Sequence, residues 1–327
     1  MSRKFRLASL VFVFALSMVL AACGAGTDDG AKTDDGADTN QEGEDATGTE
    51  TEESSGVELG QTDLTLPYVA WARETPVSYL LAAVLEDIGY NVDVKQVEAG
   101  PMWSSVADGS ADFMASAWLP ATHASYWEEY QDDLVQVNQV LDRAPLALAV
   151  PSYVEDINSM EDLKDNTEFG EAVDWTITGI DAGAGIMQNT EKALEEYELD
   201  NWELLSSSEA AMIAELRSAY ENEEPIIVPL WKPHWVFGVM DMKMLEDPKE
   251  IYGGDGDQIY IVARKGLEED APAAYKVLEQ YTEDYEMVEE LMPPIFDEDK
   301  DPEEVVRQWI EDNPDRVAEW TEGVTNE

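Results

Sequence analysis

Two stretches of the chain place a tryptophan, a proline and a histidine in the same order at the end of an apolar run. The first, ADFMASAWLPATH, contains Trp118, Pro120 and His123, and the second, IIVPLWKPH, contains Trp231 and His234. These two histidines are the only ones among 327 residues. Indole faces attract cations and apolar groups, and an imidazole can donate to a carboxylate. These residues are therefore candidate binding residues.

A third tryptophan, Trp71, ends the apolar run at 64–71. Open α/β sheets bind ligands beyond the carboxyl ends of their strands, so we expect Trp71, Trp118 and Trp231 to face one cleft. Each tryptophan alone is equally consistent with core packing, and it is the set of three at comparable positions that favours a site. Several indole faces suit a quaternary ammonium, which carries a positive charge but no N–H to donate.

A glycine-rich turn, GIDAGAG at 179–185, follows a predicted strand and opens a predicted helix. Backbone N–H groups in such a turn, together with the helix N-terminus, can hold an anion. The alternative is an ordinary turn in which Asp181 caps the helix. The GxGxxG spacing of a dinucleotide site is absent. We expect His123 to donate to a ligand carboxylate and His234 to be structural.

Strands and helices alternate along the chain, and the order strand–helix–strand–helix–strand occurs twice, each time ending in Trp-x-Pro. This pattern predicts an α/β fold with two lobes, each a mainly parallel sheet flanked by helices, joined by crossover strands at 146–150 and 259–262. We expect lobe 1 to comprise residues 61–147 and 263–327, and lobe 2 to comprise 148–262. The apolar spacing in 271–324 predicts three or four helices that return to lobe 1.

The N-terminal residues have the pattern of an export signal. A basic start and an apolar run too short for a membrane span predict a signal peptide over 1–22. Leu20-Ala21-Ala22 precedes Cys23, the only cysteine, which indicates lipid attachment at that residue. Residues 23–60 are acidic and nearly free of apolar side chains, so we expect a flexible tether.

The net charge of −53 argues against nucleic-acid binding and against docking to anionic lipid. We find no GxSxG or phosphate-binding motif, no clustered metal ligands and no catalytic cysteine. The sequence therefore predicts neither an enzyme nor a cofactor or metal. The predicted location is the outer face of the cell membrane, held there by lipidated Cys23.

The sequence resembles the glycine betaine-binding lipoproteins of bacterial ABC importers. The resemblance lies in YVAW, VLEDIGY, VEAGPMW, SAWLPATH, TGIDAGAGIM and PLWKPHWVF, which begin at residues 68, 84, 97, 116, 178 and 229. It implies a two-lobed type II substrate-binding fold and a prism of three tryptophans around the trimethylammonium group, which by position are Trp71, Trp118 and Trp231. It also implies carboxylate contacts from the backbone amides of Gly179 and Ile180 and from His123.

The predicted function is capture of glycine betaine, or a related quaternary ammonium osmolyte, for an ABC permease and its ATPase. Alternatives are a receptor for proline betaine, carnitine or choline, and a surface lipoprotein without a transport role. An amino-acid receptor ranks lower, because Arg73 and Asp181 are the only obvious local charges that could bind such a ligand. The sequence alone leaves open whether His234, Arg73 or Asp181 touches the ligand.

Overall fold

The computed structural model describes residues 57–324. The predicted signal peptide at 1–22, Cys23 and most of the predicted tether at 23–60 lie outside the described residues. Within 57–324, no helix combines the length and the apolar character needed to cross a membrane.

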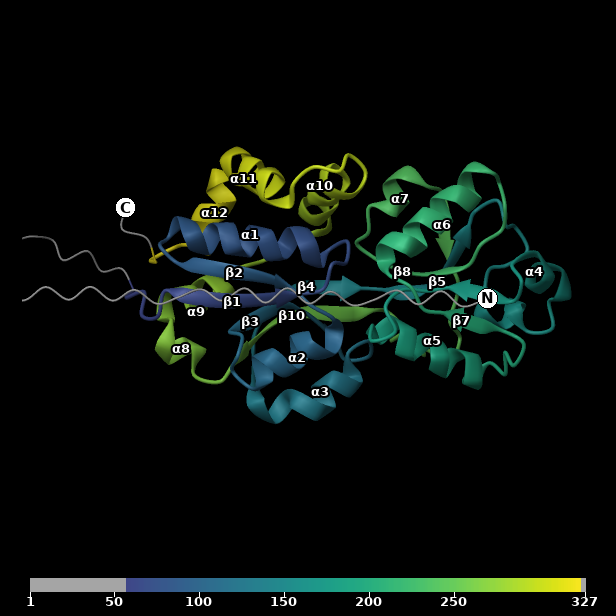
Figure 1. Cartoon of the computed structure of the whole chain (residues 1–327), viewed down its shortest axis with the longest axis horizontal. Coiled ribbons are helices and arrows are strands. Elements are labelled where there is room, and N and C mark those ends of the chain that lie inside the picture. The colour runs from purple at the N-terminus through teal and green to yellow at the C-terminus, as the bar shows by residue number, and fades with distance from the viewer. Residues whose placement is uncertain (1–56, 325–327) are drawn as a thin grey trace, which may run out of the picture. The chain divides into compact units, whose positions relative to one another are not determined.

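One group of strands forms lobe 1, in which two parallel strands lie beside an antiparallel three-stranded sheet with the order β3-β10-β4 (Figure 1). A backbone hydrogen bond of 2.9 Å from Asp112, just before β3, to Thr65 in β1 links the two sets. The strands of lobe 1 are β1 (Asp63–Tyr68), β2 (Asn91–Gln96), β3 (Phe113–Leu119), β4 (Leu134–Ala144) and β10 (Asp257–Arg264).

Lobe 2 repeats this plan with a parallel pair, β6-β7, beside an antiparallel sheet with the order β8-β5-β9. A 3.0 Å hydrogen bond from the backbone N–H of Thr178 to the oxygen of Ile227 links the pair to the strand that follows. The strands of lobe 2 are β5 (Leu146–Pro151), β6 (Thr176–Thr178), β7 (Glu203–Leu205), β8 (Val228–Trp231) and β9 (Met242–Met244).

The chain crosses between the lobes twice. Pro145 alone separates β4 from β5, and the segment 245–256 leads back from β9 to β10. The parallel pairing that the sequence predicts is found in β1–β2 and β6–β7, whereas the strands next to the crossovers pair antiparallel. Because β5 begins at Leu146 and β10 at Asp257, we propose lobe boundaries near 145 and 256 in place of those predicted at 147/148 and 262/263.

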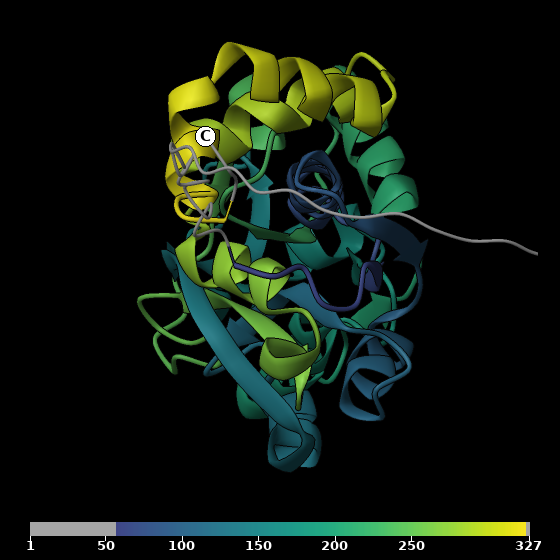
Figure 2. The same cartoon turned by 90° about the vertical axis from the view of Figure 1, so that its left-hand side faces the viewer.

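Helices cover both lobes and bury their own apolar faces against them. In α1, apolar residues recur at helical spacing and the face they form is buried against lobe 1. Helix α11 packs against α1, and Figure 2 shows the C-terminal helices gathered on that side (yellow). The helices of lobe 1 are α1 (Glu74–Asp87), α2 (Ala99–Ala107), α3 (Ala124–Tyr130), α8 (Leu267–Asp270), α9 (Pro272–Gln280), α10 (Tyr285–Phe296), α11 (Pro302–Asp312) and α12 (Pro314–Trp320).

The helices of lobe 2 complete its α/β layers. Helices α5 and α6 follow β6 and β7 in the strand–helix order that the sequence predicts. The helices of lobe 2 are α4 (Thr167–Ala172), α5 (Gly185–Glu196), α6 (Glu209–Glu221) and α7 (Val236–Val239). Two short 3₁₀ helices, Gln131–Asp133 and Met160–Leu163, complete the regular structure within residues 57–324.

Candidate ligand-binding site

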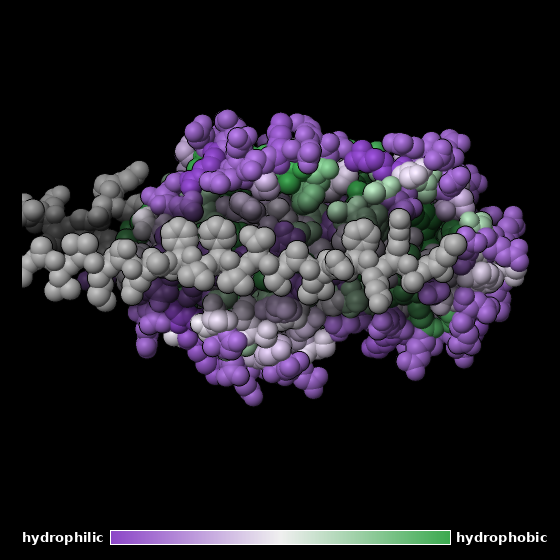
Figure 3. All heavy atoms as spheres, viewed as in Figure 1, coloured by the Kyte–Doolittle hydropathy of each residue, from purple (hydrophilic) through white to green (hydrophobic). Residues whose placement is uncertain are grey.

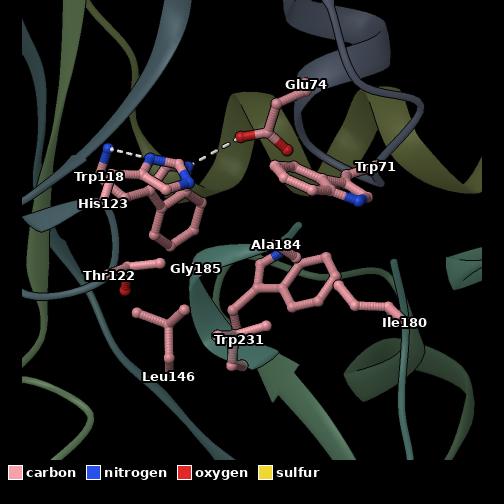
Figure 4. Close-up of a pocket in the computed structure, with 11 residues that line it drawn as sticks. Trp71, Glu74, Trp118, Thr122, His123, Leu146, Ile180, Ala184, Gly185 and Trp231 are labelled. Atoms are coloured by element: carbon pink, nitrogen blue, oxygen red, sulfur yellow. Dashed lines mark hydrogen bonds between the residues drawn. The ribbon is translucent and has the colours of Figure 1, made fainter. Parts of the chain in front are cut away.

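A pocket lies between the lobes. Figure 4 shows the three predicted tryptophans on three sides of the same space. Lobe 1 supplies Trp71, Glu74, Trp118, Thr122 and His123, and lobe 2 supplies Leu146, Ile180, Ala184, Gly185, Ile186 and Trp231. The structure thus brings together five of the six predicted ligand-binding residues, and Gly179 is the one that does not line the pocket.

Each tryptophan is placed by the end of a strand. Trp71 lies between β1 and α1, Trp118 is the second-to-last residue of β3, and Trp231 is the last residue of β8. The indole N–H of Trp71 donates to Asp181 Oδ2 at 3.1 Å, and that of Trp118 donates to Glu74 Oε1 at 2.8 Å. These bonds fix two of the rings by their polar edges. Indole faces held in this way can pack against a methylated cation.

The His123 ring is buried, with 1% of the residue exposed, and it lines the pocket. Its Nδ1 accepts a hydrogen bond from the Trp118 backbone N–H at 3.1 Å, which leaves the proton of the neutral ring on Nε2. Burial lowers the pKa of His123 to about 3, and the Ser116 backbone carbonyl opposes that shift only in part. His123 is therefore a neutral donor at physiological pH.

A buried carboxylate orients the turn that carries His123. Asp257, the first residue of β10, accepts from the backbone N–H groups of Ala121 and Thr122 at 2.7 and 2.8 Å. Sequence reasoning missed Asp257, because its partners lie more than 130 residues away in the chain.

His234 has the structural role that we expect from the sequence pattern. Its Nδ1 accepts from the Val236 backbone N–H, and its Nε2 lies 3.2 Å from Glu209 Oε1. Its ring packs edge to face on Trp231, with centroids 5.0 Å apart. Burial raises the pKa of Glu209, and the hydrogen bond to His234 opposes this shift. His234 does not line the pocket, so it supports Trp231 from behind.

The two amides predicted for the anion site, those of Gly179 and Ile180, have partners within the protein. The Gly179 N–H already donates to Leu205 O at 2.8 Å, so it is not available to a ligand. The Ile180 N–H points to Met187 Sδ at 3.3 Å, and Ile180 reaches the pocket without a free amide. The pocket is instead lined by Gly185 and Ile186, the first two residues of α5.

The start of α5 is open to an anion. Its N-cap residue, Ala184, has no side-chain oxygen to accept a hydrogen bond, and no side chain caps the helix. The first amides of any helix lack a partner within it, so those of Gly185 and Ile186 can donate to a carboxylate at the positive end of the helix dipole. The predicted glycine-rich turn is thus at the site, but the available amides lie six residues beyond those predicted.

Arg73 and Asp181 do not line the pocket. The Arg73 guanidinium is fully buried and forms an ion pair with Glu283, with Nε–Oε2 and Nη2–Oε1 distances of 3.0 and 2.5 Å. Asp181 is engaged by the Trp71 indole. Both charges are thus engaged within the protein, where they support the walls of the pocket.

Hydrogen bonds join the two lobes around the pocket. Besides the bond from Trp71 to Asp181, the Ala72 N–H donates to Glu209 Oε2 at 3.0 Å. In addition, the Tyr126 hydroxyl donates to Gly183 O at 2.7 Å, and the Ser125 hydroxyl donates to Gln188 Oε1 at 2.7 Å. These hydrogen bonds hold the lobes closed on each other.

Comparison with known proteins identifies the family. Residues 62–312 match the model of the substrate-binding domain of ABC-type glycine betaine transport systems. The chain belongs to this family. Its members are transport proteins rather than enzymes, and substrate-binding proteins of ABC importers are extracytoplasmic.

Individual relatives agree with this assignment. The chain is 48% identical over 159 residues to the glycine betaine/carnitine transport binding protein of Listeria monocytogenes, covering 48% of this chain and 52% of that protein. The chain thus spans about half the length of this curated relative.

Two solved structures of substrate-binding proteins are similar in fold. The crystal structure of lactococcal OpuAC, closed and complexed with glycine betaine, is 35% identical with a TM-score of 0.75, and the match covers 80% of this chain and 100% of that one. The glycine/betaine/L-proline-binding protein ProX from Borrelia burgdorferi is 34% identical with a TM-score of 0.76, over 79% and 96% of the two chains. The fold is therefore that of a type II periplasmic binding protein, as predicted.

Proposed function

We propose that this protein captures glycine betaine, or a closely related betaine, and delivers it to an ABC importer. The observation that carries the proposal is the set of three indoles, Trp71, Trp118 and Trp231, that surround one pocket from both lobes, beside an uncapped helix N-terminus. A betaine has a methylated cation at one end and a carboxylate at the other. The pocket offers matching chemistry to both ends.

The indoles suit the cationic end of the ligand. A quaternary nitrogen cannot donate a hydrogen bond, so it gains from aromatic faces and from burial of its methyl groups. Each desolvated cation–π contact contributes about 1–2 kcal/mol. A hydrated inorganic cation would lose its water and gain too little in return, so such a pocket favours the organic cation in a salty medium.

The donors at the other side of the pocket suit the carboxylate. We propose that Nε2 of His123 and the amides of Gly185 and Ile186 hold it, in place of the predicted Gly179 and Ile180 amides. These three donors support a ligand with an anionic end, and choline, which has none, would leave them without a partner. A buried donor left unpaired costs about 1–3 kcal/mol, which favours a betaine over choline.

Carnitine and proline betaine share the required groups and remain alternatives that the measurement below separates. An amino-acid ligand is disfavoured because its ammonium needs hydrogen-bond acceptors and its carboxylate often uses an arginine. The nearby arginine, Arg73, is committed to Glu283 and does not line the pocket.

We further propose that the protein is held at the outer face of the cell membrane by lipid on Cys23, and that it hands its ligand to a permease driven by a separate ATPase. The proposal rests on the apolar run that ends just before Cys23 and on the acidic stretch that follows it. No chemical conversion of the ligand is part of this function.

Calorimetric titration with glycine betaine, proline betaine, carnitine, choline and proline tests the proposal. We expect glycine betaine or proline betaine to bind most tightly and proline not to bind. In Trp118→Ala, betaine affinity should fall roughly tenfold or more, because one cation–π contact is lost. Trp175→Ala, which removes an indole outside the pocket, should leave affinity unchanged. If no quaternary amine binds, the protein is a surface lipoprotein with another role.

A further inference from the structure

Glu74 is a buried carboxylate in the wall of the pocket, and sequence reasoning did not select it. It is the first residue of α1, three positions after Trp71, and only 2% of it is exposed. Its Oε1 accepts from the Trp118 indole at 2.8 Å and from the Ser116 hydroxyl at 3.1 Å. Figure 4 shows its second oxygen directed toward the Trp71 side of the pocket.

That second oxygen, Oε2, makes no hydrogen bond within residues 57–324. This oxygen is not enclosed by protein atoms but faces the pocket, so a group that enters the pocket can compensate its charge. A quaternary ammonium provides such compensation through charge alone, since it has no N–H. A primary ammonium would instead require a defined hydrogen bond at this oxygen.

The charge balance around Glu74 also favours a cationic ligand group beside it. Within residues 57–324, the ion pair to Glu74 comes from Arg73, whose Nη1 donates to Glu74 Oε1 at 3.4 Å while its Nε and Nη2 are bound by Glu283. The same Nη1 that faces Glu74 also donates to the Ala115 carbonyl at 2.5 Å. One guanidinium thus faces two buried carboxylates, and the one at the pocket wall is left incompletely compensated. Leaving a buried charge in this state is unfavourable, and a ligand cation would correct it.

Resting on the proposed function, we propose that Glu74 is a specificity-determining residue that selects the charge of the ligand's trimethylated group. The indole faces also accept a neutral group of the same shape, because burial of methyl groups does not depend on charge. The Glu74 carboxylate adds an electrostatic attraction that acts on a cationic group and not on a neutral one. Because Glu74 is buried, salt screens this attraction only weakly. Through Oε1 it also holds the Trp118 indole in place.

The test compares two ligands of nearly the same shape. Glycine betaine carries a trimethylammonium group, and 3,3-dimethylbutanoate carries a neutral tert-butyl group in its place. The wild-type protein should prefer glycine betaine. In Glu74→Gln the amide oxygen can still accept from Trp118, but the charge is gone. We expect the betaine preference to fall roughly tenfold or more, mainly through weaker betaine binding.

Two further variants separate charge from structure. Ser116→Ala removes a hydrogen bond to Oε1 but keeps the charge, so its ligand preference should equal that of the wild type. Glu74→Asp keeps the charge but draws it back from the pocket, so its preference should lie between those of the wild type and Glu74→Gln. Because the preference is a ratio measured on one preparation, a partly inactive sample does not distort it.

The outcomes are distinct. If Glu74→Gln and Glu74→Asp lose affinity for both ligands equally and keep the wild-type preference, Glu74 only positions Trp118 and the inference is wrong. If Glu74→Gln does not fold, the preference of Glu74→Asp decides in the same way. If the wild-type protein binds neither ligand, the proposed function itself fails.

Discussion

His123 illustrates how burial fixes the protonation state of a single binding residue. Its ring nitrogen Nδ1 is occupied as an acceptor, and burial holds its pKa at about 3. In the unfolded chain the same ring has an ordinary pKa near 6.5 and takes up a proton as the pH falls. The folded state does not bind that proton until the pH is near 3. The neutral His123 ring therefore contributes its full share of the free energy of unfolding above pH 6.5. That share is lost progressively as the pH falls from 6.5 to 3.

This linkage gives a prediction for His123→Gln, which removes the titrating ring. As the pH falls from 7 to 5, protonation of His123 in the unfolded chain should reduce the free energy of unfolding of the ligand-free wild-type protein by about 2 kcal/mol. The variant should not show this reduction. Urea unfolding at several pH values measures the difference. Above pH 7 the two proteins should have the same pH dependence, which serves as the internal control. Parallel curves from pH 7 to 5 would contradict the neutral, buried ring.

At the residue scale, the sequence indicated pocket residues where a tryptophan or histidine stands at the end of a predicted strand. Trp71, Trp118, Trp231 and His123 are all found at the pocket, because buried apolar runs reveal strands and strand ends meet at the cleft. We propose other amides than that of Gly179 because its N–H donates to Leu205 O, and this pairing between the β6 and β7 segments is not visible in a single strand's residues. Glu74 was missed because acidic residues are abundant in this chain.

At the scale of elements, α5 depends on a close approach between the lobes. A Cβ added at Gly185 would lie 2.0 Å from the backbone oxygen of Thr122, which belongs to the opposite lobe. The lobes can therefore close over the pocket only because Gly185, the first residue of α5, has no side chain. At Gly183 an added Cβ would meet its nearest atom, the Tyr126 hydroxyl oxygen, at 3.5 Å, an ordinary contact.

We therefore predict that Gly185→Ala weakens betaine binding roughly tenfold or more, because the clash with Thr122 opposes closure. The matched control, Gly183→Ala, should bind nearly as well as the wild type. Titration calorimetry measures the affinities, and small-angle X-ray scattering with and without betaine measures closure. Wild-type affinity and compaction in Gly185→Ala would show that the lobes do not need this contact.

Among the elements, the strand–helix–strand–helix–strand order that the sequence predicts is found in the structure, for example in β6, α5, β7, α6 and β8. The long strand β4 was missed, because its buried and exposed residues do not alternate regularly. Irregular pairing with β10 explains this, since register shifts interrupt the alternation of side chains along the strand. Such shifts depend on the partner strand, so the sequence of β4 alone could not indicate them.

For the whole molecule, the buried Arg73–Glu283 pair connects distant parts of the chain. Arg73 precedes α1 at the pocket, and Glu283 precedes α10 in the C-terminal helices. The sequence predicts that those helices return to lobe 1, and the packing of α11 on α1 places them there. The residue pair that fixes this return was not predictable, because 210 positions separate its members.

The net charge of −53 gives a prediction about salt for the whole protein. Figure 3 shows hydrophilic residues over much of the visible rim of both lobes. Repulsion among exposed carboxylates opposes folding, and added salt screens it, so the melting temperature should rise as KCl increases from 0.1 to about 2 M. A betaine carries no net charge and its partners are buried, so its affinity should change less than about threefold over the same range.

Thermal unfolding and calorimetric titration at matched salt concentrations test both parts. NaCl should have the same effect as KCl, because screening depends on ionic strength rather than on the identity of the cation. A rise in melting temperature with only one of the two salts would indicate a specific cation site instead of screening. A steep loss of betaine affinity with salt would mean that exposed ion pairs hold the ligand, which contradicts a pocket built from buried indole faces, amides and a neutral imidazole.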